Sequence, residues 1–289
     1  MMRCWLVAFA LFAVAVPARA ADRLNVVASF SILGDFVRNV GGDKIAVTTL
    51  VGPGSDAHVY APTPADARRV ADARLIFVNG FGFEGWLPRL VKSAGAKATV
   101  ITATSGITPL KLGSEADPHA WQSVVNAKRY VANIRDALAA ADAANAETYK
   151  SNAGVYLEKL DALDREVCEA VAGLPEGRRK VISTHNAFGY FAAAYGVEFI
   201  APLGVSTESE ASARDIAGII TQIRRAKIPA VFLENVSDPR LIGRIAAETG
   251  ARVGGTLYSD SLTGEKGDSP TYIAMVRHNI KALTGALSP

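Results

Sequence analysis

The sequence predicts an α/β protein of two lobes, each a mostly parallel sheet flanked by helices, joined by one long rigid helix. Short runs rich in β-branched residues alternate with stretches of helical periodicity, which is the pattern of βα units around a parallel sheet. This alternation breaks after about Ser123 and resumes near Lys180. Between these points apolar residues recur at helical spacing, so a helical segment separates the two α/β segments.

Strands are expected where β-branched and apolar residues cluster between turn residues. In the first lobe these clusters lie at residues 24–28, 45–51, 75–78 and 99–102, with helical patterns such as residues 64–73 between them. In the second lobe they lie at residues 180–183, 197–200, 230–233 and 252–257. Each lobe should therefore contain a sheet of its own.

The connecting segment, from Val124 to about Ala172, has no strand signal and no proline. Its second part carries an apolar stripe at helical spacing, formed by Tyr149, Tyr156, Leu160, Leu163, Val167 and Val171. We expect a helix from about residue 143 to 172, which at ~1.5 Å per residue would span ~45 Å, more than the width of a small domain. The expected organisation is a first lobe at residues 21–142, a linking helix at 143–174 and a second lobe at 175–289.

The first twenty residues have the pattern of a secretory signal peptide. Arg3 precedes an apolar run from Trp5 to Val16, and small residues lead up to Ala20. Cleavage is expected after Ala20, and the apolar run is shorter than the ~20 residues that a membrane span needs. Cys4 lies too near the start of this segment to serve as a lipid anchor. The sequence therefore predicts a protein exported to the periplasm without a tether.

Cysteine content and charge exclude two further classes of protein. Removal of the signal peptide leaves Cys168, so no intrachain disulfide can form, and the amphipathic run around Cys168 predicts a buried apolar side chain. The formal charge of +3 falls to about +1 once Arg3 and Arg19 are removed. Lys and Arg form no cluster of the kind that neutralises phosphates, so nucleic acid is not an expected partner.

Three of the four histidines occupy positions where α/β folds bind ligands. His58 and His185 follow predicted strands, and His119 lies in a loop ahead of a predicted helix. In open α/β sheets, ligands bind beyond the carboxyl ends of the strands. Neutral imidazoles that converge suit a borderline-soft divalent metal, and a tetrahedral site needs a fourth donor. Asp260, which again follows a predicted strand, is the best candidate, so the metal would be held between the lobes.

Each of these residues has a simpler interpretation when it is taken alone. A single loop histidine is more often a surface or hydrogen-bonded residue than a ligand, and Asp260 is most simply a turn residue. His278 lies in the C-terminal helical pattern and is expected to cap or pack that helix. Composition and spacing therefore suggest a metal site and leave these alternatives open.

Six motifs occur together and in one order: "SFSILGDFVRNVGGD", "GSDAHVYAPTPAD", "NGFGFEGWL", "DPHAW", "STHNAFGYFAAAYG" and "ENVSDPRLIGRIAAETGARVGG". Through them the chain resembles, over essentially all of residues 21–289, the zinc and manganese periplasmic solute-binding proteins of ABC transporters, the family of the zinc-uptake complex component A. The resemblance implies two α/β lobes bridged by a rigid helix. It also implies a metal-ligand role for His58, His119, His185 and Asp260.

The third ligand position bears on the choice of metal. In the family that the chain resembles, this position is His in many zinc receptors and Glu in many manganese receptors, and here it is His185. An imidazole in place of a carboxylate lowers the negative charge and hardness of the site, which favours Zn²⁺ over Mn²⁺. Three-His, one-Asp sites of the family are associated with manganese too, so a manganese receptor stays an alternative.

The function expected from the resemblance is high-affinity capture of Zn²⁺ between the two lobes and its delivery, by a monomer, to an inner-membrane ABC permease. The long His-rich loop that many zinc members carry before "DPH" is replaced by "KLGSEADPH". Capture would then depend on the site itself or on a separate periplasmic donor protein. Asp117 and Glu210 are candidates to orient the imidazoles, and Tyr60 and Trp121 to shield them from solvent.

Two other classes of function compete with this one. A zinc-dependent hydrolase would use three histidines and a metal-bound water, with Asp260 as the base. The chain has neither an HExxH nor a GxSxG motif, and four protein ligands would leave no open position for a substrate, so an enzyme is not expected. A receptor for an organic ligand, or an adhesin, would need a wide cleft lined by aromatic or arginine side chains, which the candidate loops do not offer.

Overall fold

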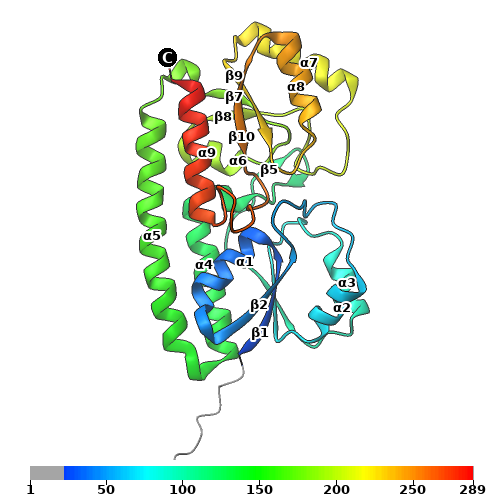
Figure 1. Ribbon diagram of the computed structural model, residues 1–289, viewed down its shortest axis with the longest axis vertical. Coiled ribbons are helices and arrows are strands. Elements are labelled where there is room, and N and C mark those ends of the chain that lie inside the picture. Colours follow the sequence, from blue (N-terminus) through cyan, green and yellow to red (C-terminus); the bar gives the residue numbers. More distant parts are fainter. Residues whose placement is uncertain (1–22, 289) are drawn as a thin grey trace, which may run out of the picture.

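The computed structural model describes residues 23–288 and contains two four-stranded parallel sheets, one per lobe, with long helices running along one side (Figure 1). The predicted fold class is confirmed. The predicted signal peptide lies outside the described residues. No helix within residues 23–288 is both long and apolar enough to cross a bilayer.

The first sheet has the strand order β2-β1-β3-β4, and all its neighbouring strands are parallel. Its strands are β1 (Leu24–Phe30), β2 (Ile45–Val51), β3 (Leu75–Val78) and β4 (Thr99–Thr102). The helices of this lobe are α1 (Ser31–Gly41), α2 (Pro64–Ala71) and α3 (Leu87–Ser93), with a 3-10 turn at Gly42–Lys44. Residues 26–30 of β1 are continuously buried, as expected for a central strand covered on both faces.

The second sheet has the order β10-β9-β7-β8, again with parallel neighbours. Its strands are β7 (Lys180–Ile182), β8 (Glu198–Ile200), β9 (Ala230–Glu234) and β10 (Arg252–Leu257). Its helices are α6 (Gly189–Tyr195), α7 (Ala213–Ala226) and α8 (Pro239–Thr249), with a 3-10 turn at Glu176–Arg178. The strands of both sheets lie within two residues of the predicted segments, because β-branched runs between turn residues have few alternatives to a buried strand.

Helix α5 (Ala146–Ala172) runs alongside both lobes (Figure 1). Its buried face is the apolar stripe that the periodicity predicts. It packs against α1, against α4 (Val124–Ala141) and against α9 (Tyr272–Leu287), which in turn lies on β10. Twenty-seven residues at ~1.5 Å each span about 40 Å, so one helix supports both lobes.

Three local features differ from the sequence-based expectations. Residues 143–145 form a 3-10 turn, so α5 begins at Ala146. A small antiparallel hairpin, β5 (Lys111–Leu112) with β6 (Glu115–Ala116), was not predicted because its strands are only two residues long. The prediction that Cys168 is buried is wrong, since its side chain is exposed. Cys168 follows the buried Val167 and therefore points about 100° away from the apolar stripe.

Candidate metal centre

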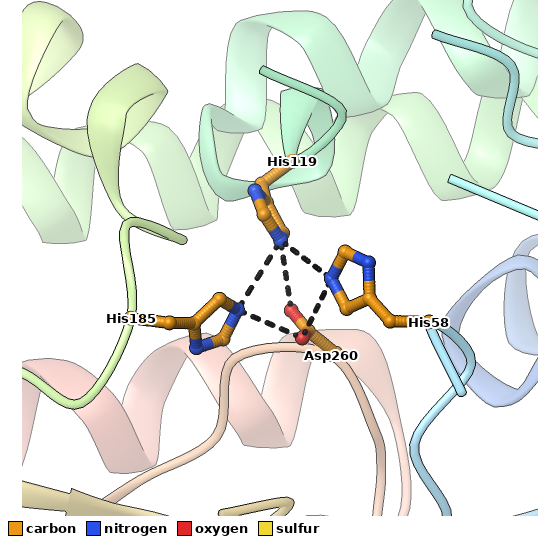
Figure 2. Close-up of side chains that lie close together, drawn as sticks. All are labelled: His58, His119, His185 and Asp260. Atoms are coloured by element: carbon orange, nitrogen blue, oxygen red, sulfur yellow. Dashed lines mark hydrogen bonds and ion pairs between the residues drawn. The ribbon is translucent and has the colours of Figure 1, made fainter. Parts of the chain in front are cut away.

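The four side chains predicted as metal ligands meet between the lobes (Figure 2). One potential ligand atom from each lies within 4.8 Å of those from the other three. The Nε2 atom of His119 is 3.3 Å from Nε2 of His58 and 3.4 Å from Nε2 of His185. Asp260 completes the group, with carboxylate oxygens 3.6 Å from Nε2 of His58, 3.5 Å from that of His119 and 3.1 Å from that of His185.

The chain delivers these side chains from the loops that follow its strands. His58 lies in the loop after β2, His185 follows β7, and Asp260 follows β10. His119 directly precedes a 3-10 turn at Ala120–Gln122 that leads into α4. Because the carboxyl ends of the strands in both sheets face the space between the lobes, loops far apart in sequence reach the same point.

Burial and charge set the electrostatics of the centre. His119, His185 and Asp260 have no exposed surface, and His58 is 7 % exposed. Burial by itself disfavours a charged imidazole, but the negative charges of Glu234 and Asp260 outweigh it and raise the pKa of His185. Burial likewise disfavours a charged carboxylate, yet the neighbouring His185 and His119 hold the pKa of Asp260 well below its usual value. The centre therefore keeps one carboxylate ionised among the imidazoles.

Two carboxylates outside the group of four orient its imidazoles. Asp117 Oδ1 lies 2.8 Å from Nδ1 of His119 and also accepts the backbone N–H of that residue at 2.9 Å. Glu234 Oε2 lies 2.5 Å from Nδ1 of His185, and its Oε1 accepts the backbone N–H groups of His185 and Thr184. The hydrogen bond of His119 to Asp117 and the ion-pair contact of His185 with Glu234 both occupy the Nδ1 side of the ring and leave the Nε2 side open. These contacts turn both Nε2 atoms toward the centre.

The predicted role for Asp117 agrees with these contacts, whereas the prediction for Glu210 is wrong. Glu210 is exposed near Arg240, and among residues 23–288 no hydrogen bond or ion pair joins it to the four side chains. The carboxylate beside the imidazole of His185 comes instead from Glu234, at the carboxyl end of β9. Glu234 was not among the predicted site residues. The rule that found His58 and His185, a polar residue where a predicted strand ends, would have found Glu234 too.

Aromatic rings shield the centre. Trp121 is fully buried with its ring centroid 5.2 Å from that of His119, as predicted. Phe83, which was not predicted, packs edge-on against His58 at 4.7 Å and His119 at 6.1 Å. Tyr60, predicted to shield the site, packs at a tilt against Trp86 instead and donates its hydroxyl hydrogen to Asp66. The wall beside the imidazoles is therefore formed by Phe83 and Trp121.

The loop after β3 ties together the two histidine loops of the first lobe. The side-chain amide of Asn79 donates to the carbonyl of Pro118, and the indole N–H of Trp86 donates to the carbonyl of Ala57. Between them, buried Glu84 accepts the hydroxyl of Ser29 and the backbone N–H of Asn79. The loop thus holds the residues just before His119 and His58 while presenting Phe83 to both rings.

The fourth histidine stays apart from the centre. His278 lies in α9, where its Nε2 is 3.0 Å from the carbonyl of Thr256 and its ring packs against Tyr258. Its Nδ1 is 3.3 Å from Asp268. The expectation that His278 packs within the terminal helix is therefore confirmed.

Comparison with known proteins gives the chain a family. Residues 26–286 match the sequence profile of the family described as zinc-uptake complex component A, periplasmic. The chain is 36% identical over 272 residues to the iron-binding protein YfeA of Yersinia pestis, covering 92% of this chain and 87% of that protein. It is 34% identical over 268 residues to the manganese-binding lipoprotein MntA of Halalkalibacterium halodurans, covering 92% and 89%.

Solved structures agree with this assignment. The periplasmic zinc binding protein TroA from Treponema pallidum superposes with a TM-score of 0.89 at 30% identity, covering 92% of this chain and all of that chain. The Mn-bound periplasmic metal binding protein from Candidatus Liberibacter asiaticus gives 0.84 at 33% identity, with the same coverage. The chain therefore belongs to the zinc-uptake complex component A family, the metal-binding periplasmic receptors of ABC transporters.

Proposed function

We propose that this receptor captures Zn²⁺ through Nε2 of His58, His119 and His185 together with the carboxylate of Asp260, and delivers the ion to a membrane permease. The observation that carries the proposal is the size of the ligand cage. Zn–N and Zn–O bonds of about 2.0–2.2 Å place the ligands of a tetrahedron roughly 3.3–3.6 Å apart. Five of the six separations between the four side chains run from 3.1 to 3.6 Å when both oxygens of Asp260 are counted. With one ligand atom taken from each side chain, all four atoms lie within 4.8 Å of one another.

The chemistry of the donors supports the same assignment. Three of the four donors are imidazoles, borderline ligands that suit Zn²⁺, and divalent affinities rise from Mn²⁺ toward Zn²⁺. Four protein donors fill a tetrahedral site and leave no position for a reactive water. Because the family consists of receptors, the chain is not an enzyme, and the hydrolase alternative is discarded.

One observation favours Mn²⁺ as a second candidate. Both carboxylate oxygens of Asp260 lack a hydrogen-bond partner within the described part of the chain, and they face different imidazoles. Asp260 could therefore bind through both oxygens and raise the coordination number above four, which suits a harder ion. Relatives whose names specify manganese or iron are also among the similar proteins.

The setting of this activity follows from the family and from the sequence. We propose that residues 1–20 direct export and are cleaved after Ala20, and that a monomer with lobes at residues 21–142 and 175–289 then meets the permease. A periplasmic donor protein that loads the site remains part of the proposal. Faster zinc transfer from such a donor than from free buffer would support it, and equal rates would refute it.

The test of the proposed function is a metal competition. Metal-stripped protein is equilibrated with equal, limiting Zn²⁺ and Mn²⁺, freed of unbound ions and analysed by mass spectrometry. We expect about one zinc per chain and far less in His185→Ala after the unbound ions are removed, because loss of one of four donors weakens zinc binding by orders of magnitude. Retention of manganese instead would support the second candidate. Retention of neither ion, or unchanged zinc in His185→Ala, would refute the proposed ligand set.

Zinc binding is expected to release about one proton per ion near pH 7, because the raised pKa of His185 keeps its imidazole charged in the metal-free protein. The zinc affinity should fall by about tenfold for each pH unit below that pKa.

The stability of the metal-free protein should depend on pH in the opposite direction from zinc affinity. The charged His185 stabilises the metal-free fold fully below the unfolded pKa near 6.5, and this stabilisation is lost as the pH rises through the folded pKa.

Calorimetry in buffers of different ionisation enthalpy measures the proton count directly. Of the two carboxylates that raise the pKa of His185, Glu234 has the larger effect. Glu234→Gln removes its charge, so fewer protons should be released on zinc binding at the same pH. An equal proton count in the two proteins would contradict the role assigned to Glu234.

A further inference from the structure

The metal centre is enclosed, so an ion needs a route to reach it. Three of the four side chains have no exposed surface, and His58 exposes 7 % of its own. Figure 2 shows the imidazoles and the carboxylate turned toward one another from four separate loops. Aromatic rings cover the side of His58 and His119. Access must therefore come from another direction.

A polar pocket adjoins the centre on the side of β7 and β9. It has a volume of about 380 Å³ and lies where the carboxyl ends of these strands meet the start of α8. Two of its lining residues contact or adjoin the proposed ligands: Thr184 precedes His185, and Asp56 Oδ1 accepts the backbone N–H of His58 at 2.8 Å. β7 and β9 are neighbouring strands, and the chain continues from β7 to β8 on one side of the pair and from β9 to β10 on the other. In α/β folds, ligand sites commonly form at the point where the strand order reverses in this way.

The walls of the pocket favour a cation. The pocket is lined by three carboxylates and by one guanidinium, that of Arg240, which is paired with Asp238. The other two carboxylates are those of Asp56 and Glu210. An excess of negative charge in a cleft raises the local concentration of cations. The surroundings thus suit a hydrated divalent ion better than an anion.

The pocket also contains a buried polar atom without a partner. Thr184 is 2 % exposed and lines the pocket, and its hydroxyl has no hydrogen-bond partner anywhere in residues 23–288. A buried hydroxyl is normally hydrogen-bonded, so an unpaired one marks a place for a missing ligand or water. One residue before His185, this hydroxyl is placed to accept from the water shell of an incoming ion.

One hydrogen bond across the two lobes joins two residues that line the pocket. The hydroxyl of Thr207, in the segment between β8 and α7, donates to Oδ2 of Asp56 at 2.6 Å. The same Asp56 holds the backbone of His58 through its other oxygen. Breaking the Thr207 contact therefore loosens the loop that carries His58 on its pocket side, while the backbone N–H of Gly54 still holds the loop to Leu262 and Ser261. No atom that would bind the metal is touched.

Building on the proposed receptor function, we propose that this pocket is the vestibule through which a hydrated divalent cation enters and leaves the centre, and that the hydrogen bond between Asp56 and Thr207 is its gate. Asp56 and Glu210 attract the ion, and the hydroxyl of Thr184 binds its water shell. The ion then exchanges these waters for the imidazoles. Glu210 is exposed and apart from the ligands because it acts at the outer end of this route.

The gate is tested by the rates of zinc exchange. Stopped-flow fluorescence of Trp121, beside His119, follows Zn²⁺ binding, and an excess of a chromophoric chelator follows release. Thr207→Val should raise both rates by about tenfold, the effect of one lost hydrogen bond to a charged group, and leave the equilibrium affinity nearly unchanged. Thr207→Ser keeps the hydroxyl and should restore the wild-type rates.

The charge of the vestibule is tested by a matched pair of variants. Glu210→Gln should slow zinc association by roughly threefold at low salt, and the effect should shrink as salt is added. Glu158→Gln removes the same charge from the exposed side of α5 and should leave the rate unchanged. Stoichiometric zinc binding by the wild type is measured first, and its absence would overturn the receptor function as well. With binding intact, wild-type rates in both Thr207→Val and Glu210→Gln would overturn the vestibule alone.

Discussion

Asp260→Ala is expected to weaken Zn²⁺ binding about a thousandfold. Closed four-ligand zinc sites bind with ~10–16 kcal/mol, so an equal share per ligand is about 2.5–4 kcal/mol, or two to three orders of magnitude in affinity. Asp260 belongs at the upper end of that range because it is the one anion among the four, and its two oxygens are within 3.1–3.6 Å of all three Nε2 atoms. Competition against a chelator of known zinc affinity measures the change.

The matched control for this substitution is Asp268→Ala. Asp268 belongs to the same loop between β10 and α9, but it is exposed and bonds Tyr258 and His278 rather than the centre. Its removal should change zinc affinity by less than about twofold. Circular dichroism of the metal-free variants establishes that both fold. Zinc affinity within tenfold of wild type in folded Asp260→Ala would exclude this carboxylate as a ligand.

The second large effect expected is on thermal stability. Zinc at a thousandfold excess over its dissociation constant should raise the unfolding temperature by about 10 °C. Binding to the folded state alone contributes ~4 kcal/mol at that excess. A chain of this size gains about 2–4 °C for each kcal/mol. The gain arises because the ligands come from loops of both lobes, which come together only when the protein is folded.

Scanning calorimetry with two controls isolates this effect from general salt effects. Mg²⁺ at the same concentration prefers oxygen ligands and retains its waters, so it should leave the unfolding temperature of the wild type nearly unchanged. Asp260→Ala should lose most of the zinc-dependent rise. An equal rise with Mg²⁺, or an undiminished rise in the variant, would mean that the metal stabilises the protein through other groups.

Much of this architecture is predictable from the sequence because one rule supplies both fold and site. A run such as residues 75–78 can hardly be anything but a buried strand. The polar residue that follows a strand at its carboxyl end faces the crevice. The approach of His58, His185 and Asp260 to one point follows from this rule. Glu234 directly follows the predicted strand at residues 230–233 and satisfies the rule too, although it was not among the predicted site residues.

Other contacts have no signature in the chain. Phe83 lies in a glycine-rich loop, and nothing in its spacing reveals that its ring packs on His58 and His119. Glu210 was predicted to orient an imidazole, but it lies in an exposed loop near Arg240. Cys168 is next to Val167, a residue of the apolar stripe of α5. A small rotation of the helix about its axis would decide whether a side chain at the edge of the stripe is buried. These outcomes depend on tertiary packing.

The small hairpin of β5 and β6 has a consequence for how the receptor responds to supply. It stands just before His119, where many zinc receptors carry a histidine-rich loop, and the remaining histidine outside the centre, His278, is engaged with Thr256. With the proposed centre as the one zinc position within residues 23–288, occupancy should follow a simple hyperbola and rise from a tenth to nine-tenths over a roughly 80-fold range of free zinc. The fraction of loaded receptor would then change gradually with free zinc, and this part of the chain would hold no second pool of ions for the transporter.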